Sequence, residues 1–156
     1  AHPSTRLLRE EAFTAGVLHC CGLPVLADNL PEQLKQAIAN ARRDQQRLQA
    51  HEISKFGGSY AQVGGYLLGL WNLPIQIVEA VLHHSNGPPA TGPVAPLSLL
   101  VHAAHALLGE FMPLIEGVRA DPLNRSAVES IGWSPLMPLW QQCVTEVFND
   151  SKTPKH

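Results

Sequence analysis

The sequence has little charge and no excess of either sign. Charged residues make up 15% of its 156 residues, and the formal net charge is −2. Nucleic acids and anionic membranes are bound mainly by basic surfaces, because their phosphates attract positive charge. We therefore expect neither a nucleic acid nor a membrane surface as a partner.

Cysteines and long apolar runs are also scarce. The three cysteines, Cys20, Cys21 and Cys143, form an odd set that has neither the spacing of a zinc knuckle nor that of a disulfide framework, which favours a reducing compartment. No apolar run reaches the roughly 18 residues that would span a bilayer. The first residues, AHPSTRLLREEAF, lack the apolar centre of a signal peptide. The sequence therefore predicts a soluble, cytoplasmic protein.

Alternation of apolar and polar residues, which is typical of strands, is missing over any useful length. Apolar residues instead recur three and four positions apart in several segments, which indicates helices. The hydrophobic content of 45% is enough for one core. We therefore expect a single all-α domain over residues 1–150, a bundle of about six to seven helices, followed by a tail at 151–156.

Turn-forming residues divide the chain into helical segments. Gly22 and Pro24 are expected to end a first helix that begins near Leu8, because glycine suits the end of a helix and proline cannot continue one. Asn29 is the expected cap of the next helix. The apolar stripe of that helix consists of Leu34, Ile38 and Ala41.

Several apolar or small residues are expected to pack closely. Trp71 ends an apolar segment and should anchor the core. Cys21 and Cys143 should be buried as small hydrophobic residues, whereas the run ARRDQQR should face solvent. Glycines in a helix lower its propensity but allow another backbone to approach. Three of them lie between Tyr60 and Trp71, namely Gly64, Gly65 and Gly69.

Histidines are the main candidates for chemistry. Histidine is the commonest metal ligand, but hard cations also require carboxylates, and the only acids that stand out nearby in the sequence are Asp28 and Glu79. The adjacent His83 and His84 point about 100° apart on a helix. Two interpretations stay open: histidines whose hydrogen bonds are satisfied in the core or at helix ends, or a metal centre. Five histidines lie in or beside apolar helices, namely His19, His83, His84, His102 and His105.

Three segments follow one another in a specific order: EEAFTAGVLHCCGLPVLADNLPE, HEISKFGGSYAQVGGYLLGLWNLPIQIVEAVLHHSNGPP and VHAAHALL. Their order and spacing resemble those of the HDOD family, a branch of the HD-domain phosphohydrolase superfamily related to HD-GYP proteins. The resemblance covers residues 10 to about 110. It implies a helical bundle of the HD/HDOD type. Relatives usually carry a further helical portion before the first segment, so we expect this chain to be shortened at its N-terminus or to be a fragment.

In active HD relatives a metal pair is held by a histidine, a His-Asp doublet, further histidines and a late aspartate. Here Cys20 stands at the aspartate of the doublet, Tyr60 at one histidine and His105 at the late aspartate. The doublet aspartate bridges two metals, and cysteine is a poor bridge between hard cations. The stretch SNGPPATG also lacks the Gly-Tyr-Pro signature of HD-GYP proteins. The resemblance therefore implies a degenerate site.

The retained histidines lead to a main hypothesis and two alternatives. The main one is a non-catalytic, regulatory signal-transduction module of the bacterial cytoplasm, which acts through protein partners, can form a homodimer and needs no cofactor. The first alternative is a divergent metal-dependent phosphohydrolase or cyclic dinucleotide phosphodiesterase with bound Mn, Fe or Zn. The second is a module that binds a nucleotide without turnover. The candidate metal ligands, vestigial under the main hypothesis, are His19, His83, His84 and His105.

Overall fold

The computed structural model describes residues 3–89 and 95–152, and within these ranges all regular structure is helical. The all-α prediction is confirmed, and the helix expected after Asn29 is divided in two. In chain order the elements are α1 (Pro3–Leu18), α2 (Gly22–Asn29), α3 (Pro31–Asp44), α4 (Leu48–Phe56), α5 (Tyr60–Leu70), α6 (Ile75–His83), α7 (Pro96–Gly109), α8 (Arg125–Ser130), the short 3-10 helix η1 (Ser134–Leu136) and α9 (Met137–Lys152).

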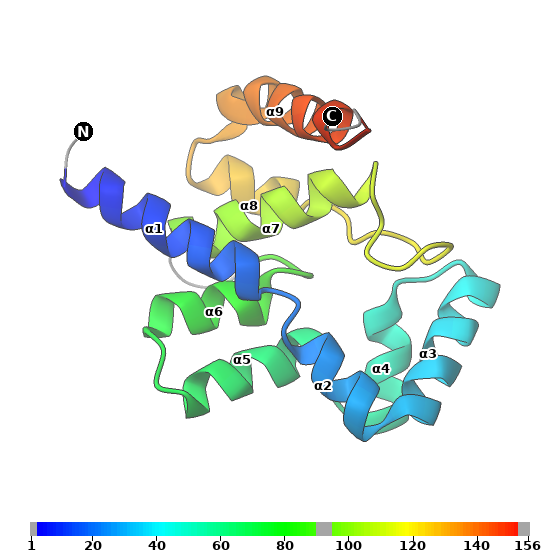
Figure 1. Ribbon diagram of the computed structural model, residues 1–156. Helices are drawn as coiled ribbons and strands as arrows, with labels where there is room; N and C mark the ends of the chain where they lie inside the picture. The colour runs from blue at the N-terminus through cyan, green and yellow to red at the C-terminus, as the bar shows by residue number, and fades with distance from the viewer. Residues whose placement is uncertain (1–2, 90–94, 153–156) are drawn as a thin grey trace.

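The central part of the fold is formed by α5, α6 and α7, which pack in sequence against one another (Figure 1). Helix α1 lies against both α6 and α7, α2 packs on α5, and α9 lies on α7. Helices α3 and α4 pair with each other at one end of the molecule (Figure 1). This arrangement places the junction between α1 and α2 next to the end of α6, where the candidate site lies.

Gly22 and Pro24 begin a helix, contrary to the expectation that they end one. Helix α1 ends at Leu18 and α2 starts at Gly22. Pro24 is accommodated in the first turn, where its missing N–H would have no partner in the helix. A Cβ on Gly22 would overlap the carbonyl oxygen of Tyr60 and lie 2.6 Å from the backbone nitrogen of Gly64. Glycine is therefore required here because two backbones touch.

The next expected helix is divided into α3 and α4. Asn29 is the last residue of α2 and not the cap of α3, and its side-chain amide donates a hydrogen bond to the carbonyl of Val25 (2.9 Å). The break after α3 occurs at Gln45, which has a positive φ of 52°. The predicted stripe is confirmed: Leu34 and Ala41 are buried and Ile38 is partly buried.

Two of the three glycines of α5 allow close packing, as predicted. A Cβ at Gly64 would lie 3.2 Å from the sulfur of Cys21, and one at Gly65 would lie 3.1 Å from the Cβ of Leu82. Gly69 has no atom within 4 Å of such a Cβ, so its expected role was wrong. Gly64 and Gly65 therefore account for the close approach of α2 and α6 to α5.

Two residues expected in the core lie at the surface. Trp71 is 61% exposed, because α5 ends at Leu70 and the chain turns at Asn72 with a positive φ of 60°. Cys143 is exposed because the buried face of α9 is at its neighbour Val144. Cys21 is partly buried and packs against the central core.

The C-terminal helix α9 reaches Lys152, so it includes the first two residues of the expected tail; residues 153–156 lie outside the described part. Among the described residues no single helix is both long and apolar enough to cross a membrane. One pair of segments bent by 118°, Arg6–Asn29 with Pro31–Asp44, meets that test jointly, by length and composition only.

Candidate functional site

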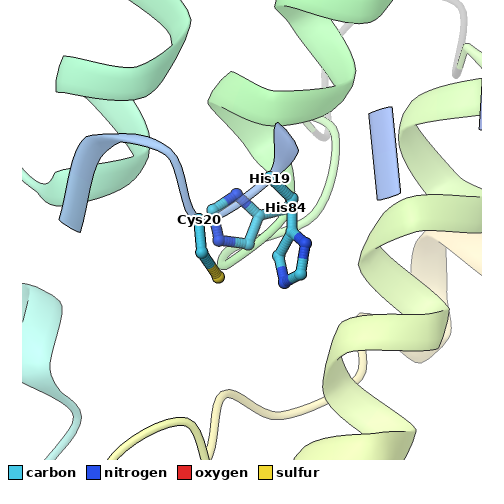
Figure 2. A group of neighbouring side chains, drawn as sticks. All are labelled: His19, Cys20 and His84. Atoms are coloured by element: carbon cyan, nitrogen blue, oxygen red, sulfur yellow. The ribbon is translucent and has the colours of Figure 1, made fainter. Parts of the chain in front are cut away.

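Three side chains of metal-ligand type meet where α1 passes into α2 and α6 ends. His19 and Cys20 lie in the link between α1 and α2, and His84 directly follows α6 (Figure 2). One ligand atom from each of the three lies within 4.8 Å of the others. We call His19, Cys20 and His84 the histidine-cysteine cluster. Helix α1 packs against α6, and Gly22 packs against the backbone of α5. These two contacts hold the link between α1 and α2 next to the end of α6.

The protonation pattern of both imidazoles follows from their hydrogen bonds. Nδ1 of His19 lies 2.6 Å from the carbonyl oxygen of Gly16, and Nδ1 of His84 lies 2.6 Å from that of Val81. A carbonyl oxygen only accepts, so in each ring Nδ1 carries the hydrogen and Nε2 keeps its lone pair. Burial lowers the pKa of both rings, that of His84 to about 3, with repulsion from His105 as a smaller cause for each. Both imidazoles are therefore neutral at pH 7.

Tyr60 occupies one of the two available lone pairs. Its hydroxyl lies 3.0 Å from Nε2 of His84 and donates to it, because burial raises the pKa of the phenol and keeps it protonated. Tyr60 is the first residue of α5, and the preceding Ser59 forms a capping box with Gln62 that fixes this end of the helix. Nε2 of His19 has no hydrogen-bond partner among the described residues.

His102 and His105, three positions apart on α7, have different roles. His102 is fully buried; its Nδ1–H donates to the carbonyl of His84 (2.8 Å), and its Nε2 accepts from the backbone N–H of Asn124 (2.9 Å). It is a satisfied core histidine. The ring centroid of His105 lies 5.3 Å from that of His19 and 4.8 Å from that of His84. His105 therefore adjoins the histidine-cysteine cluster.

His83, Asp28 and Glu79 lie outside the cluster. In the described part of the chain the His83 side chain makes neither a hydrogen bond nor a ring contact, whereas its neighbour His84 is wholly buried. Asp28 and Glu79 are exposed. The separation of about 100° between adjacent helical residues explains why only one of the paired histidines reaches the site.

Two acids that the sequence did not single out lie beside the cluster. Glu52 is wholly buried; its Oε2 accepts from the backbone N–H of Tyr60 (3.1 Å), and its Oε1 has no partner. Burial raises the pKa of this carboxyl to about 7, Asp121 adds repulsion, and the hydrogen bond from Tyr60 partly offsets both. Asp121 accepts from Nε2–H of His105 through Oδ2 (3.1 Å) and pairs with Arg47 through Oδ1 (3.5 Å). Each oxygen of Asp121 therefore has a partner.

A groove gives access to the cluster. It lies between α1 and α7, has a volume of about 560 Å³ and is lined mainly by apolar side chains, with His19 and His105 among them. Ala12 and Gly16 on α1 and Leu108 on α7 form its walls. A small ion or molecule can therefore reach His19 from solvent without opening the core.

The family model for the HDOD domain matches residues 3–87, more than half of the chain. This chain belongs to the HDOD family. The match contains α1 to α6 and the whole histidine-cysteine cluster, whereas His105 and Asp121 lie beyond it. Searches of the curated proteins and of the solved structures found no significant match.

The side chains of this HDOD domain do not fit the pair of hard cations found in active HD relatives. Hard cations need carboxylate oxygens, and Cys20 stands where the resemblance to HD proteins implies the bridging aspartate. Burial, and repulsion from Cys21 and Asp121, raise the pKa of the Cys20 thiol to about 12, so the thiol is protonated. Of the two nearby acids, Asp121 has both oxygens engaged, and Glu52 has a raised pKa.

The acids were missed for different reasons. Glu52 lies four residues after Leu48, and both are buried on the same face of α4, so the helical period could have placed this carboxyl on an apolar face. Asp121 follows α7 in a segment without regular structure, and it reaches the site only through the tertiary fold. Local sequence carried no signal for it.

Proposed function

We propose that this HDOD domain is a non-catalytic regulatory module of the bacterial cytoplasm, which acts through protein-protein contacts and retains a vestigial HD metal site. HDOD domains are often linked to signalling, which supports a regulatory role. The three cysteines are free thiols, which supports a reducing compartment.

The absence of a free carboxylate at the histidine-cysteine cluster, among the described residues, is the main support for the non-catalytic part of the proposal. Hydrolysis by a metal pair needs carboxylates that bridge the ions and a bound water with a lowered pKa. Here a neutral thiol stands at the bridging position, and both oxygens of Asp121 are held by His105 and Arg47. Tyr60 also occupies the lone pair that His84 would offer a metal. These features favour a site that is stable without catalytic ions.

Exposed apolar side chains support a role in protein contacts. On α1, Phe13 is 75% exposed and Val17 is 67% exposed. A second group lies where α5 passes into α6 and includes Leu70, Trp71 and Ile75, each more than 60% exposed. Neighbouring apolar side chains of this size at a surface commonly mark interfaces between proteins. A homodimer or a different protein could cover either region.

The proposal is tested by measuring hydrolysis. Tag-free protein from cells supplied with manganese and iron is analysed for metals and then assayed with Mn²⁺ on a phosphomonoester, a phosphodiester and a cyclic dinucleotide. We expect turnover no greater than that of the His84→Ala variant. His83→Ala is the matched control, because His83 is adjacent in sequence but lies outside the cluster. Metal-dependent hydrolysis that is lost in His84→Ala and kept in His83→Ala would contradict the proposal.

A further inference from the structure

The two imidazoles of the histidine-cysteine cluster are held in the way that zinc-binding histidines are held. Such histidines usually donate the N–H of the non-ligating nitrogen to a carbonyl or carboxylate, which fixes the tautomer and the direction of the ring. His19 does this with Gly16 and His84 with Val81, both at 2.6 Å. Each ring therefore has a defined Nε2 lone pair before any ion binds.

The donor atoms select a class of ion. Two imidazole nitrogens and one sulfur suit Zn²⁺ and similar borderline or soft ions, whereas Mn²⁺ and Mg²⁺ prefer oxygen ligands. Ligands about 2.0–2.3 Å from a tetrahedral ion lie roughly 3.3–3.8 Å apart. One ring nitrogen of each histidine and the sulfur of Cys20 lie within 4.8 Å of one another, so small side-chain rotations would close the site. We infer that His19, Cys20 and His84 bind a single Zn²⁺ ion.

Binding exchanges existing interactions for metal-ligand bonds. The Cys20 thiol releases its proton to solvent and binds as thiolate, and Nε2 of His84 exchanges the hydroxyl of Tyr60 for the ion. His105 is the nearest further imidazole, since its ring lies 4.8 Å from that of His84. The groove between α1 and α7 gives the ion a route to His19.

This inference goes beyond the proposed function and does not depend on it. A bound Zn²⁺ would connect the link between α1 and α2 with the end of α6, and so stabilise the native fold without any reaction. Hydrolysis of phosphoesters would overturn the proposed function and leave the zinc site standing. Absence of zinc binding would overturn the site and leave the proposed function standing.

The experiment uses Co²⁺ and Zn²⁺ as probes of the tag-free, chelator-treated protein. Co²⁺ should produce the thiolate-to-cobalt charge-transfer band and the d–d bands of a four-coordinate site, and about one equivalent of Zn²⁺ should abolish them. Mn²⁺ in large excess should leave them unchanged. Cys20→Ser should weaken Zn²⁺ binding at least about 100-fold, because even the loss of an outer partner costs about 10–100-fold. Cys21→Ser, a substitution of the neighbouring thiol outside the cluster, should bind as the original protein does.

A second variant tests the geometry in the opposite direction. Tyr60→Phe removes the hydroxyl that competes for Nε2 of His84, so Zn²⁺ should bind about two- to tenfold more tightly, the equivalent of one ordinary hydrogen bond. A wild-type Co²⁺ spectrum without a thiolate band would overturn the inference. So would unchanged affinity in Cys20→Ser or equal affinity for Mn²⁺. If Cys20→Ser does not fold, the wild-type spectrum and Tyr60→Phe still decide the question.

Discussion

The buried carboxyl of Glu52 predicts a contribution to the stability of the metal-free protein that falls as the pH rises, opposite in sign to that of the buried histidines. Glu52 has no exposed surface, and the groups that act on it are the backbone N–H of Tyr60 and the carboxylate of Asp121. Its pKa is about 7 in the folded state, against an ordinary value of 4.5. The folded state therefore holds this proton more tightly than the unfolded state does.

The sign and the size follow from linkage. Below pH 4.5 the carboxyl is protonated in both states, so it brings no penalty. Between pH 4.5 and about 7 the unfolded state loses the proton first, so the contribution of Glu52 to the free energy of unfolding falls; above that range this contribution levels off. At about 1.4 kcal/mol for each pKa unit, the rise from 4.5 to about 7 costs at most about 3.5 kcal/mol.

The test is Glu52→Gln, which keeps the shape of the side chain and removes its charge. Urea unfolding of the metal-free protein is measured at pH 5 and pH 8 for both proteins. A buried amide N–H without a partner costs the variant about 1–3 kcal/mol at both pH values, so the difference between the two pH values is the informative quantity. We expect the stability at pH 8, relative to that at pH 5, to be higher in the variant than in the original protein by up to about 2.5 kcal/mol.

Glu79→Gln is the control, because Glu79 is exposed and its substitution should change stability by less than about 0.5 kcal/mol at either pH. The reasoning would be refuted if the stability of Glu52→Gln and that of the original protein changed by the same amount between pH 5 and pH 8. In that case the buried carboxyl would not be the group that titrates in this window.

Two further predictions concern packing and are checked by chemical denaturation. Gly22→Ala should cost about 1–3 kcal/mol or more, because its Cβ would meet backbone atoms of α5, whereas Gly69→Ala should be neutral or stabilising by up to about 1 kcal/mol; equal effects would contradict the assigned contact. Leu68→Ala should cost about 2–5 kcal/mol because Leu68 is wholly buried, and Trp71→Ser should stay within about 0.5 kcal/mol. A large loss for Trp71→Ser would refute its surface position.

The helical period predicted the fold class well because it records which residues face the core. It located the stripe of α3 at Leu34 and Ala41, both of which are buried. The helical period did not reveal why position 22 is a glycine. A glycine can be required by a positive φ or by a closely packed neighbouring backbone, and only the fold distinguishes these two causes. The prediction that Trp71 is buried was wrong for a related reason. Helix α5 ends one residue before Trp71, and whether the side chain is buried depends on that boundary.

The site was predicted in part. The resemblance indicated His19, His83, His84 and His105. The structure brings His19 and His84 together with Cys20, places the ring of His105 beside them and leaves His83 outside. The acids Glu52 and Asp121 were not predicted: the helical period of α4 could have indicated that Glu52 is buried, whereas Asp121 reaches His105 only through the tertiary fold. A sequence pattern can indicate candidate ligands, whereas the charges and burial around those ligands depend on the whole fold.

A neutral thiol at Cys20 is compatible with the nearby carboxyl groups of Glu52 and Asp121. Asp121 already repels negative charge at position 20, since it contributes to the raised pKa of Cys20, and it also raises the pKa of Glu52. An aspartate at position 20 would add a further carboxyl beside these two, and without bound cations one of them would have to stay protonated or destabilise the fold. Cysteine avoids this repulsion because its thiol stays neutral in the metal-free protein. It still offers sulfur to a soft ion, so the same thiol supports both the proposed absence of hydrolysis and the inferred zinc binding.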